Sequence, residues 1–299
     1  MSFGASPPVP RLPSPVEELR DERIAERGIR LFLKRDDLIH PEIPGNKWRK
    51  LKYNLLAAKE LGLSTLLTFG GPYSNHLRAT AAAGELFGFS TIGVVRGEEH
   101  LPLNPSLEQA TSRGMRLTYL DRTTYRRKND EDVIEALRRR YGECYVLPEG
   151  GSNPLGVRGC AELPAELDLD FDVICCPVGS GGTLAGIAVG LAVGRRALGF
   201  SVLRGGQFLT REVARLQQEA SGAVSEAWSI EYDYHFGGFA KSTAELRSFI
   251  DDFEDRHKLR LDRVYVAKMM SGIFDLAADS AKLPTGSVVV AVVTGPADD

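Results

Sequence analysis

Apolar and polar positions follow two alternating periods along most of the chain, which predicts strands and helices in turn. Short apolar runs typical of strands are each followed by a stretch with apolar residues at helical spacing. The strands are predicted at 30–35, 65–69, 90–95, 116–120, 144–147, 172–178, 201–203 and 288–293, and the helices at 47–61, 75–87, 105–113, 130–140, 184–193, 210–220, 243–256 and 268–278. This order predicts an α/β fold whose mostly parallel sheets are covered by helices on both faces.

A lysine stands at the start of the first long helix. Gly45-Asn46 forms a turn just before it, and Gly62 follows the last apolar position of the helix. Free backbone N–H groups at a helix start favour anions, so Lys47 is expected near such a site. Taken alone, a lysine in such a position is far more often an ordinary surface charge.

The sequence GGPYSNH at 70–76 links a predicted strand to an alanine-rich helix. In an open α/β sheet, ligands bind at the carboxyl ends of strands, which is where Ser74, Asn75 and His76 are expected to lie. The alternative is that Ser74 or Asn75 only caps the helix. His76 could be a buried structural histidine bonded to a carbonyl.

A second glycine turn, Gly179-Ser180-Gly181-Gly182-Thr183, follows the unbroken apolar strand at 172–178. Glycines allow several backbone N–H groups to point at one spot, and the next helix adds its positive end, which suits a phosphate. The turn lacks the lysine of a Walker A loop and the full glycine spacing of a dinucleotide site. Its alternative is a tight strand-to-helix turn without a ligand.

Composition and charge exclude several classes of protein. The 299 residues carry 37 Lys+Arg against 40 Asp+Glu with no concentrated basic surface, so no nucleic acid partner is expected. The four cysteines form no CxxC pair, which predicts reduced, buried thiols and no metal site. The proline-rich first residues lack the apolar run of a signal peptide, and no segment has the length of a membrane span. We therefore expect a cytoplasmic protein without a membrane partner.

Five segments carry a resemblance to a known family. They are GNKWRKL at 45–51, GGPYSNHLRATAA at 70–82, PVGSGGTLAG at 177–186, VYVAKMMSGIFDL at 264–276 and VVTG at 292–295. In this order they resemble the family of 1-aminocyclopropane-1-carboxylate (ACC) deaminases and D-cysteine desulfhydrases. That family belongs to the fold-type II, tryptophan synthase β-like enzymes that depend on pyridoxal 5'-phosphate (PLP).

The resemblance implies two domains, each an open, mostly parallel twisted sheet flanked by helices. The large PLP-binding domain would comprise residues 1–49 and 159–299, and a small domain of residues 50–158 would be inserted between them. The resemblance also suggests a homodimer that acts on a small amino-acid substrate.

The resemblance further assigns residues to the cofactor. Lys47 is implied to hold PLP as a Schiff base, and Asn75 to hydrogen-bond its phenolic oxygen. The loop 179–183 would hold the phosphate, with Lys50 as a charge partner one turn beyond Lys47. Thr294 would face the pyridine nitrogen, and its neutral hydroxyl would leave that nitrogen largely unprotonated.

Other residues are implied to contact the substrate. Ser74, with neighbouring backbone N–H groups, would hold the substrate carboxylate, and Asn75 and His76 would lie beside it. Tyr265 matches the family's active-site tyrosine. Lys47, once released from the cofactor, would move a proton at the substrate α-carbon, because burial and a neighbouring cation lower its pKa.

The residue after Tyr265 bears on the choice of substrate. ACC deaminases resemble one another in having a glutamate there, whereas this chain has Val266, followed by Ala267 where glycine is usual. Valine can neither partner a protonated pyridine nitrogen nor act as a base. We therefore expect β-elimination from a D-amino acid such as D-cysteine, with ACC deamination as the alternative, although Val266 also departs from the threonine common in the desulfhydrases.

Two further alternatives remain open from the sequence. One is a serine or threonine dehydratase or racemase on the same fold, against which the Ser-Asn-His loop and the Tyr265 segment argue. The other is a non-catalytic protein that binds a phosphate-bearing ligand, in which Lys47 is merely a surface residue.

Overall fold

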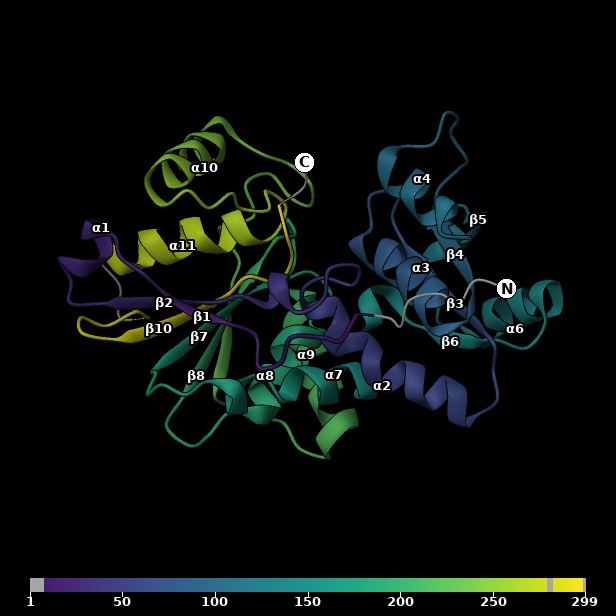
Figure 1. Ribbon diagram of the computed structural model, residues 1–299, viewed down its shortest axis with the longest axis horizontal. Coiled ribbons are helices and arrows are strands. Elements are labelled where there is room, and N and C mark those ends of the chain that lie inside the picture. The colour runs from purple at the N-terminus through teal and green to yellow at the C-terminus, as the bar shows by residue number, and fades with distance from the viewer. Residues whose placement is uncertain (1–7, 279–281, 298–299) are drawn as a thin grey trace.

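The computed structural model describes residues 8–278 and 282–297, and its strands form two separate sheets (Figure 1). The larger sheet has the strand order β1-β2-β10-β7-β8-β9. Within it, β1 is antiparallel to β2 and the other neighbours are parallel. The strands are β1 (Val16–Leu19), β2 (Arg30–Lys34), β7 (Val173–Val178), β8 (Arg196–Ser201), β9 (Trp228–Glu231) and β10 (Val288–Val292).

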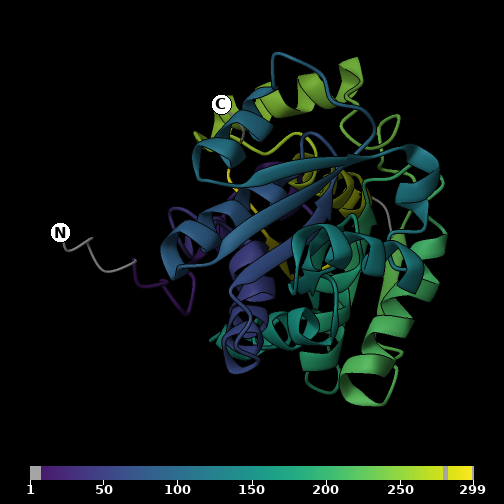
Figure 2. The ribbon, with the colours of Figure 1, turned by 90° about the vertical axis from the view of Figure 1, so that its right-hand side faces the viewer.

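The smaller sheet has the order β5-β4-β3-β6, and all its neighbours are parallel. It faces the viewer in Figure 2. Its strands are β3 (Thr65–Gly70), β4 (Ser90–Arg96), β5 (Arg116–Leu120) and β6 (Tyr145–Leu147). The predicted α/β class with mostly parallel sheets is confirmed. The strand predicted at 201–203 was wrong, because β8 ends where that prediction began, and β1 and β9 were not predicted.

Helices cover both faces of each sheet, as parallel strands buried on both sides require. On the large sheet, α1, α10 and α11 pack on one face, and α8 and α9 pack on the other (Figure 1). On the small sheet, α2 and α3 lie opposite α5 and α6. The helices are α1 (Glu22–Ala25), α2 (Asn46–Glu60), α3 (Asn75–Phe87), α4 (Pro105–Ser112), α5 (Arg122–Arg126), α6 (Glu131–Tyr141), α7 (Pro154–Ala161), α8 (Gly182–Gly190), α9 (Phe208–Ser221), α10 (Ala244–His257) and α11 (Val266–Ala278), with short 3-10 turns η1 (Asp36–Leu38), η2 (Glu149–Gly151) and η3 (Pro164–Glu166).

The chain passes from the large sheet to the small one through α2 and returns through η2 and α7. The glycine-rich segment after β6 is therefore the crossover between the two sheets. The predicted domain limits at 49/50 and 158/159 fall inside α2 and α7, two helices that pack against each other. Those limits stay a prediction.

Glycines let three helices of this crossover pack backbone against backbone. A Cβ atom added to Gly159 on α7 would lie 1.9 Å from the carbonyl oxygen of Arg49 on α2. One added to Gly186 on α8 would lie 2.3 Å from Cβ of Cys160, and one on Gly190 would lie 2.1 Å from the oxygen of Ala161. The first turns of α2 are thus held at a fixed distance from α8.

A buried cluster of charges holds the start of α2 from the other side. The Arg49 guanidinium donates to both carboxylate oxygens of Asp36 at 2.7 and 2.8 Å and to both of Glu166 at 2.7 and 2.8 Å. Lys34 lies 2.8 Å from Glu166 and donates to the Ser14 carbonyl at 2.8 Å. Two positive and two negative charges balance in this cluster, and bidentate arginine pairs fix geometry well.

Three further observations bear on the expectations from composition. All four cysteines are free and buried, which confirms that prediction. Within residues 8–278 and 282–297, no helix combines the length and apolar character needed to cross a membrane. The same residues contain no group of three or more His, Cys, Asp or Glu side chains placed to hold a metal ion.

Candidate active site

A cavity of about 870 Å³ lies at the carboxyl ends of β3, β7 and β10, between the two sheets. Its volume is typical of a site for a cofactor together with a small substrate. Nearly all the residues singled out in the sequence line it: Lys47, Lys50, Ser74, Asn75, His76, Gly179, Ser180, Gly181, Thr183, Tyr265 and Thr294. Gly182 does not line it but begins α8 directly behind the loop.

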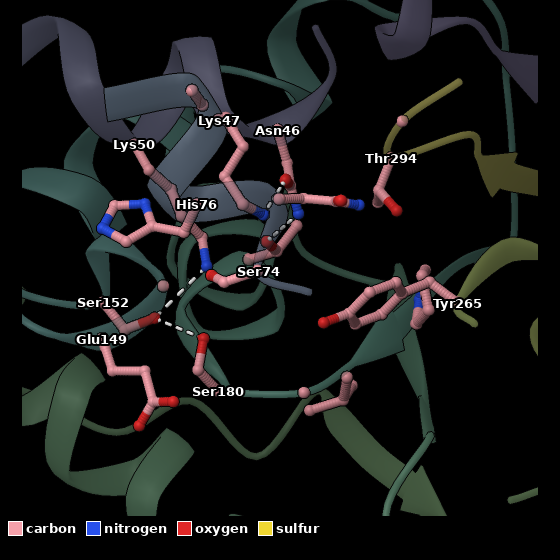
Figure 3. A pocket seen from close by; sticks show the side chains of 18 of the residues that line it. Asn46, Lys47, Lys50, Ser74, His76, Glu149, Ser152, Ser180, Tyr265 and Thr294 are labelled. Carbon is pink, nitrogen blue, oxygen red and sulfur yellow. Dashed lines mark hydrogen bonds between the residues drawn. The ribbon is translucent and has the colours of Figure 1, made fainter. Parts of the chain in front are cut away.

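A glycine brings Lys47 and Thr294 into the same cavity. Gly45 has φ of +70°, and a Cβ atom there would lie 1.8 Å from the carbonyl oxygen of Thr294. The backbone N–H of Asn46 donates to that oxygen at 3.1 Å. Only glycine fits at this close approach, and it allows the start of α2 to lie beside the end of β10. The side chains of Lys47 and Thr294 are both drawn in Figure 3.

The Lys47 amine sits in a chain of hydrogen bonds at the floor of the site (Figure 3). Its Nζ donates to Asn46 Oδ1 at 2.8 Å, and Asn46 Nδ2 donates to Thr183 Oγ1 at 2.9 Å. Desolvation, followed by the positive charge of Lys50, lowers the pKa of Lys47 to about 7. Near neutral pH a large share of this amine is therefore unprotonated and nucleophilic.

Lys50 and two serines converge on the start of α8. Lys50 Nζ donates to Ser152 Oγ at 3.2 Å, and Ser152 Oγ lies 2.7 Å from Ser180 Oγ (Figure 3). Gly181, with φ of +81°, precedes α8 and no side chain caps the helix. A Cβ atom on Gly182 would lie 2.6 Å from Ser152 Oγ, so the backbone must be bare there. A cation, hydroxyls and free N–H groups thus face one point, as a phosphate requires.

His76 is fixed and neutral. Its Nε2 lies 2.8 Å from Thr68 Oγ1, which donates its single proton to the Leu147 carbonyl at 3.0 Å, so Nε2 carries the ring hydrogen. Burial, together with the charges of Lys47 and Lys50, holds the pKa of His76 well below its usual range. The ring lies beside Lys50 at the edge of the site in Figure 3. Its contact with substrate stays a prediction.

Ser74 is both a helix cap and a member of the site. Its Oγ accepts from the backbone N–H of Leu77 at 3.4 Å at the start of α3, and the same residue lines the cavity. A Cβ atom on Gly70 would lie 2.6 Å from this hydroxyl, so the glycine leaves it room. The two alternatives drawn from the sequence are therefore compatible.

Tyr265 is set by a carboxylate and an aromatic ring. Asp262 Oδ1 accepts from the backbone N–H of Tyr265 at 2.6 Å and of Val266 at 3.3 Å, just ahead of α11. The Tyr265 ring meets that of Phe239 edge to face at 5.9 Å, and its hydroxyl points into the cavity in Figure 3. Val266 is fully buried in the core of the large sheet.

Sequence reasoning missed three residues that shape this site. Asn46 lies within the segment that carries the resemblance, but its bond to Lys47 has no sequence signal. Ser152 comes from the crossover segment after β6, and its contact with Ser180 joins residues 28 positions apart in the chain. Asp262 stands three residues before Tyr265, a spacing typical of a carboxylate at a helix start, and could have been found from that pattern.

Comparison with known proteins decides the family. The model of the family described as pyridoxal-phosphate dependent enzyme matches residues 10–295. The chain belongs to this family. It is therefore a PLP-dependent enzyme, and the non-catalytic alternative drawn from the sequence does not apply.

Individual relatives of this PLP-dependent enzyme indicate the class of reaction. A putative ACC deaminase of Pyrococcus horikoshii is 36% identical over 262 residues, which cover 84% of this chain and 81% of the relative. A D-cysteine desulfhydrase of Klebsiella pneumoniae is 28% identical over 286 residues, covering 88% and 85%. The crystal structure of an ACC deaminase homologue superposes with a TM-score of 0.84 at 32% identity, covering 97% of this chain and 91% of that chain. These relatives place the enzyme among PLP-dependent deaminases and lyases and confirm the expected fold type.

The charges of the cavity fit PLP. Neither Lys47 nor Lys50 forms an ion pair with a carboxylate in the described part of the chain. Burial also lowers the pKa of Lys50, because desolvation disfavours its charged form. An anionic phosphate beside Lys50 would compensate this charge, and an aldehyde beside Lys47 would meet a partly neutral amine.

Proposed function

We propose that this enzyme catalyses β-elimination from a small D-amino acid such as D-cysteine. With one water, D-cysteine would give pyruvate, ammonia and hydrogen sulfide. The observation that carries the proposal is Lys47, a desolvated amine with a pKa of about 7 at the floor of a cofactor-sized cavity. Such an amine can bind an aldehyde and can exchange a proton near neutral pH.

The residues divide into a cofactor side and a substrate side. Lys47 would bind the aldehyde carbon of PLP, and Lys50, Ser180 and the start of α8 would hold its phosphate. Asn75 would donate to the phenolic oxygen, and the hydroxyl of Thr294 would face the ring nitrogen. When bound, PLP supplies an electron sink for negative charge that develops at the substrate α-carbon.

On the substrate side, Ser74 and the N–H groups at the start of α3 would bind the substrate carboxylate, which suits a helix N-terminus. Lys47 would take the proton from the α-carbon. Tyr265, whose hydroxyl points into the cavity, would lie near the leaving group. His76, held neutral by its surroundings, would border the substrate without adding charge.

ACC deamination is the second candidate, with ACC and water giving 2-oxobutanoate and ammonia. A protein of Arabidopsis thaliana, 29% identical over 290 residues that cover 90% of this chain and 72% of the relative, is named a bifunctional D-cysteine desulfhydrase and ACC deaminase. The relatives support both substrates equally. Val266 favours D-cysteine over ACC, because an apolar side chain packed in the core offers no acid or base where ACC deaminases resemble one another in having a glutamate.

By resemblance to the family we also propose a homodimer, which light scattering of the purified protein would test.

The cofactor part is tested by colour. Purified protein should be yellow, and borohydride should fix the cofactor covalently to the peptide that contains Lys47, as mass spectrometry would report. Lys47→Ala should lose the fixed label, whereas Lys59→Ala, which removes a lysine from the exposed part of α2, should retain it. A label that survives in Lys47→Ala would contradict the proposal.

The substrate part is tested with a panel of D-cysteine, L-cysteine, D-serine and ACC, assayed for keto acid, ammonia and sulfide. We expect sulfide and pyruvate from D-cysteine and little 2-oxobutanoate from ACC. Equal turnover of D-cysteine and ACC would overturn the importance assigned to Val266 and leave the cofactor assignment intact.

A further inference from the structure

Arg78 holds the side-chain amide of Asn75 in one orientation. Asn75 is the first residue of α3, and Arg78 lies one helical turn further along the same face, with both residues lining the cavity. The Arg78 guanidinium donates from Nη2 to Asn75 Oδ1. A guanidinium carries donors and no acceptor, so the amide atom that faces it must be the oxygen. The Asn75 NH2 group must then point away from Arg78.

We infer that Arg78 is a positioning residue that makes Asn75 a hydrogen-bond donor toward the cofactor, an inference that rests on the proposed function. The phenolic oxygen of PLP is an acceptor when deprotonated. An asparagine amide has nearly the same shape in its two orientations, and only one of them offers N–H groups to that oxygen. The flipped amide would place its own oxygen against a negatively charged oxygen.

The charge of Arg78 has a second effect through the same contact. A cation bonded to the carbonyl oxygen of an amide polarises the amide and strengthens its N–H groups as donors. Arg78 therefore favours the deprotonated phenolic oxygen without touching it. A different role, direct binding of the substrate carboxylate by Arg78, would affect the binding of substrate and not the cofactor in the absence of substrate.

The experiment measures absorbance of the PLP-loaded full chain without substrate. The deprotonated phenolic oxygen gives the yellow visible band, and the protonated form absorbs in the near ultraviolet. Arg78→Met keeps an unbranched, uncharged stem and removes the guanidinium donors. We therefore expect the ratio of visible to near-ultraviolet absorbance to fall about fivefold, the worth of one ordinary hydrogen bond. Arg78→Lys, which is also a pure donor, should keep the ratio within about twofold of the parent.

Two further variants separate orientation from charge and from folding. Asn75→Asp keeps an oxygen for Arg78 and has no N–H group, so it should lower the ratio as much as Arg78→Met or more. Arg96→Met removes another cation from the cavity wall and should leave the ratio unchanged. If Arg78→Met does not fold, Arg78→Ala takes its place and should lower the ratio by the same amount.

An unchanged ratio in Arg78→Met or in Asn75→Asp would overturn the inference, as would an equal fall in Arg96→Met. A rise in KM for the substrate in Arg78→Met with an unchanged ratio would assign Arg78 to the substrate instead. If the parent protein takes up no PLP, the proposed function itself fails. If the parent protein is yellow and the variants keep its absorbance ratio, only the inference about Arg78 fails.

Discussion

Replacing Glu166 by glutamine should reveal how strongly the buried charge cluster holds the start of α2. The Glu166 side chain is 14% exposed and contacts the wholly buried Arg49 and Lys34. Glutamine has almost the same shape, but its NH2 group would face one of these cations. One negative charge would be lost, and the cluster would keep an uncompensated positive charge in the protein interior.

Two independent arguments give the same magnitude. Breaking a buried ion pair by removing one partner costs about 3–5 kcal/mol. Although burial opposes it, hydrogen bonds and charge from Arg49 and Lys34 lower the pKa of Glu166 from 4.5 to about 2. At 1.36 kcal/mol for each pKa unit, this shift contributes about 3.4 kcal/mol to the free energy of unfolding.

The sign of the pH dependence follows from the lowered pKa. The stabilisation is fully present above pH 4.5 and is lost as the pH falls toward 2. About 2 kcal/mol of it should be gone by pH 3, when the unfolded chain binds the proton and the folded chain does not. The Glu166→Gln chain lacks this titration, so its deficit relative to the parent should shrink on acidification.

Urea denaturation at pH 7, 5, 4 and 3 measures this difference, and thermal melting should show a loss of about 5–8 °C at pH 7. Glu162→Gln is the matched control, because Glu162 is 36% exposed and pairs with Lys52 on the same helix α2. Its loss should cost at most about 1 kcal/mol. Equal costs for the two substitutions, or a deficit of Glu166→Gln that does not change with pH, would refute the reasoning.

Three other substitutions test contacts around the site. Gly159→Ala places a methyl group 1.9 Å from the Arg49 carbonyl oxygen, so it should lower the melting temperature by several degrees and weaken PLP binding. The control Gly62→Ala has open space around it, so it should lower the free energy of unfolding by about 1 kcal/mol and leave PLP binding unchanged. Ser152→Ala removes the hydroxyl between Lys50 and Ser180 and should weaken PLP binding about fivefold in a spectroscopic titration; an unchanged Kd would exclude a role for this bridge. Lys268→Met removes the ammonium that donates to the carbonyls of residues 235 and 238 at 2.9 and 2.7 Å, so limited proteolysis should cleave the loop 235–240 faster. An unchanged cleavage rate would show that this loop, which has several residues with positive φ, keeps its conformation without the lysine.

Much of the site follows from local rules of sequence. A residue at the carboxyl end of a buried strand or at the start of the next helix lies at the ligand-binding edge of a parallel sheet. That rule alone brings Ser74, the loop 179–183 and Thr294 to one cavity, as found. Gly45 and Lys47 mark a turn and a helix start, and the neighbouring residues in the sequence predict both.

The remaining features depend on contacts between distant segments. Lys34 and Glu166 look like surface charges in the sequence, and their burial follows only from where η3 packs. Ser152 lies 102 residues from Lys50 in the chain. The strand β8 was misplaced because Gly199 weakens its pattern, yet a Cβ atom there would lie 2.6 Å from Leu184, so packing against α8 requires the glycine.

The place of β10 also has a consequence for how the protein is made. This strand is formed by residues 288–292, yet it lies between β2 and β7 in the middle of the large sheet, and the residue two positions beyond it bonds to Asn46. The small sheet, by contrast, uses residues 65–147 alone and can form while synthesis continues. During translation the ribosome therefore presents a finished small sheet beside a large sheet that is open at its centre. Lys47 gains its final setting only when residues 288–294 have emerged, so cofactor uptake should be among the last events in the maturation of a nascent chain.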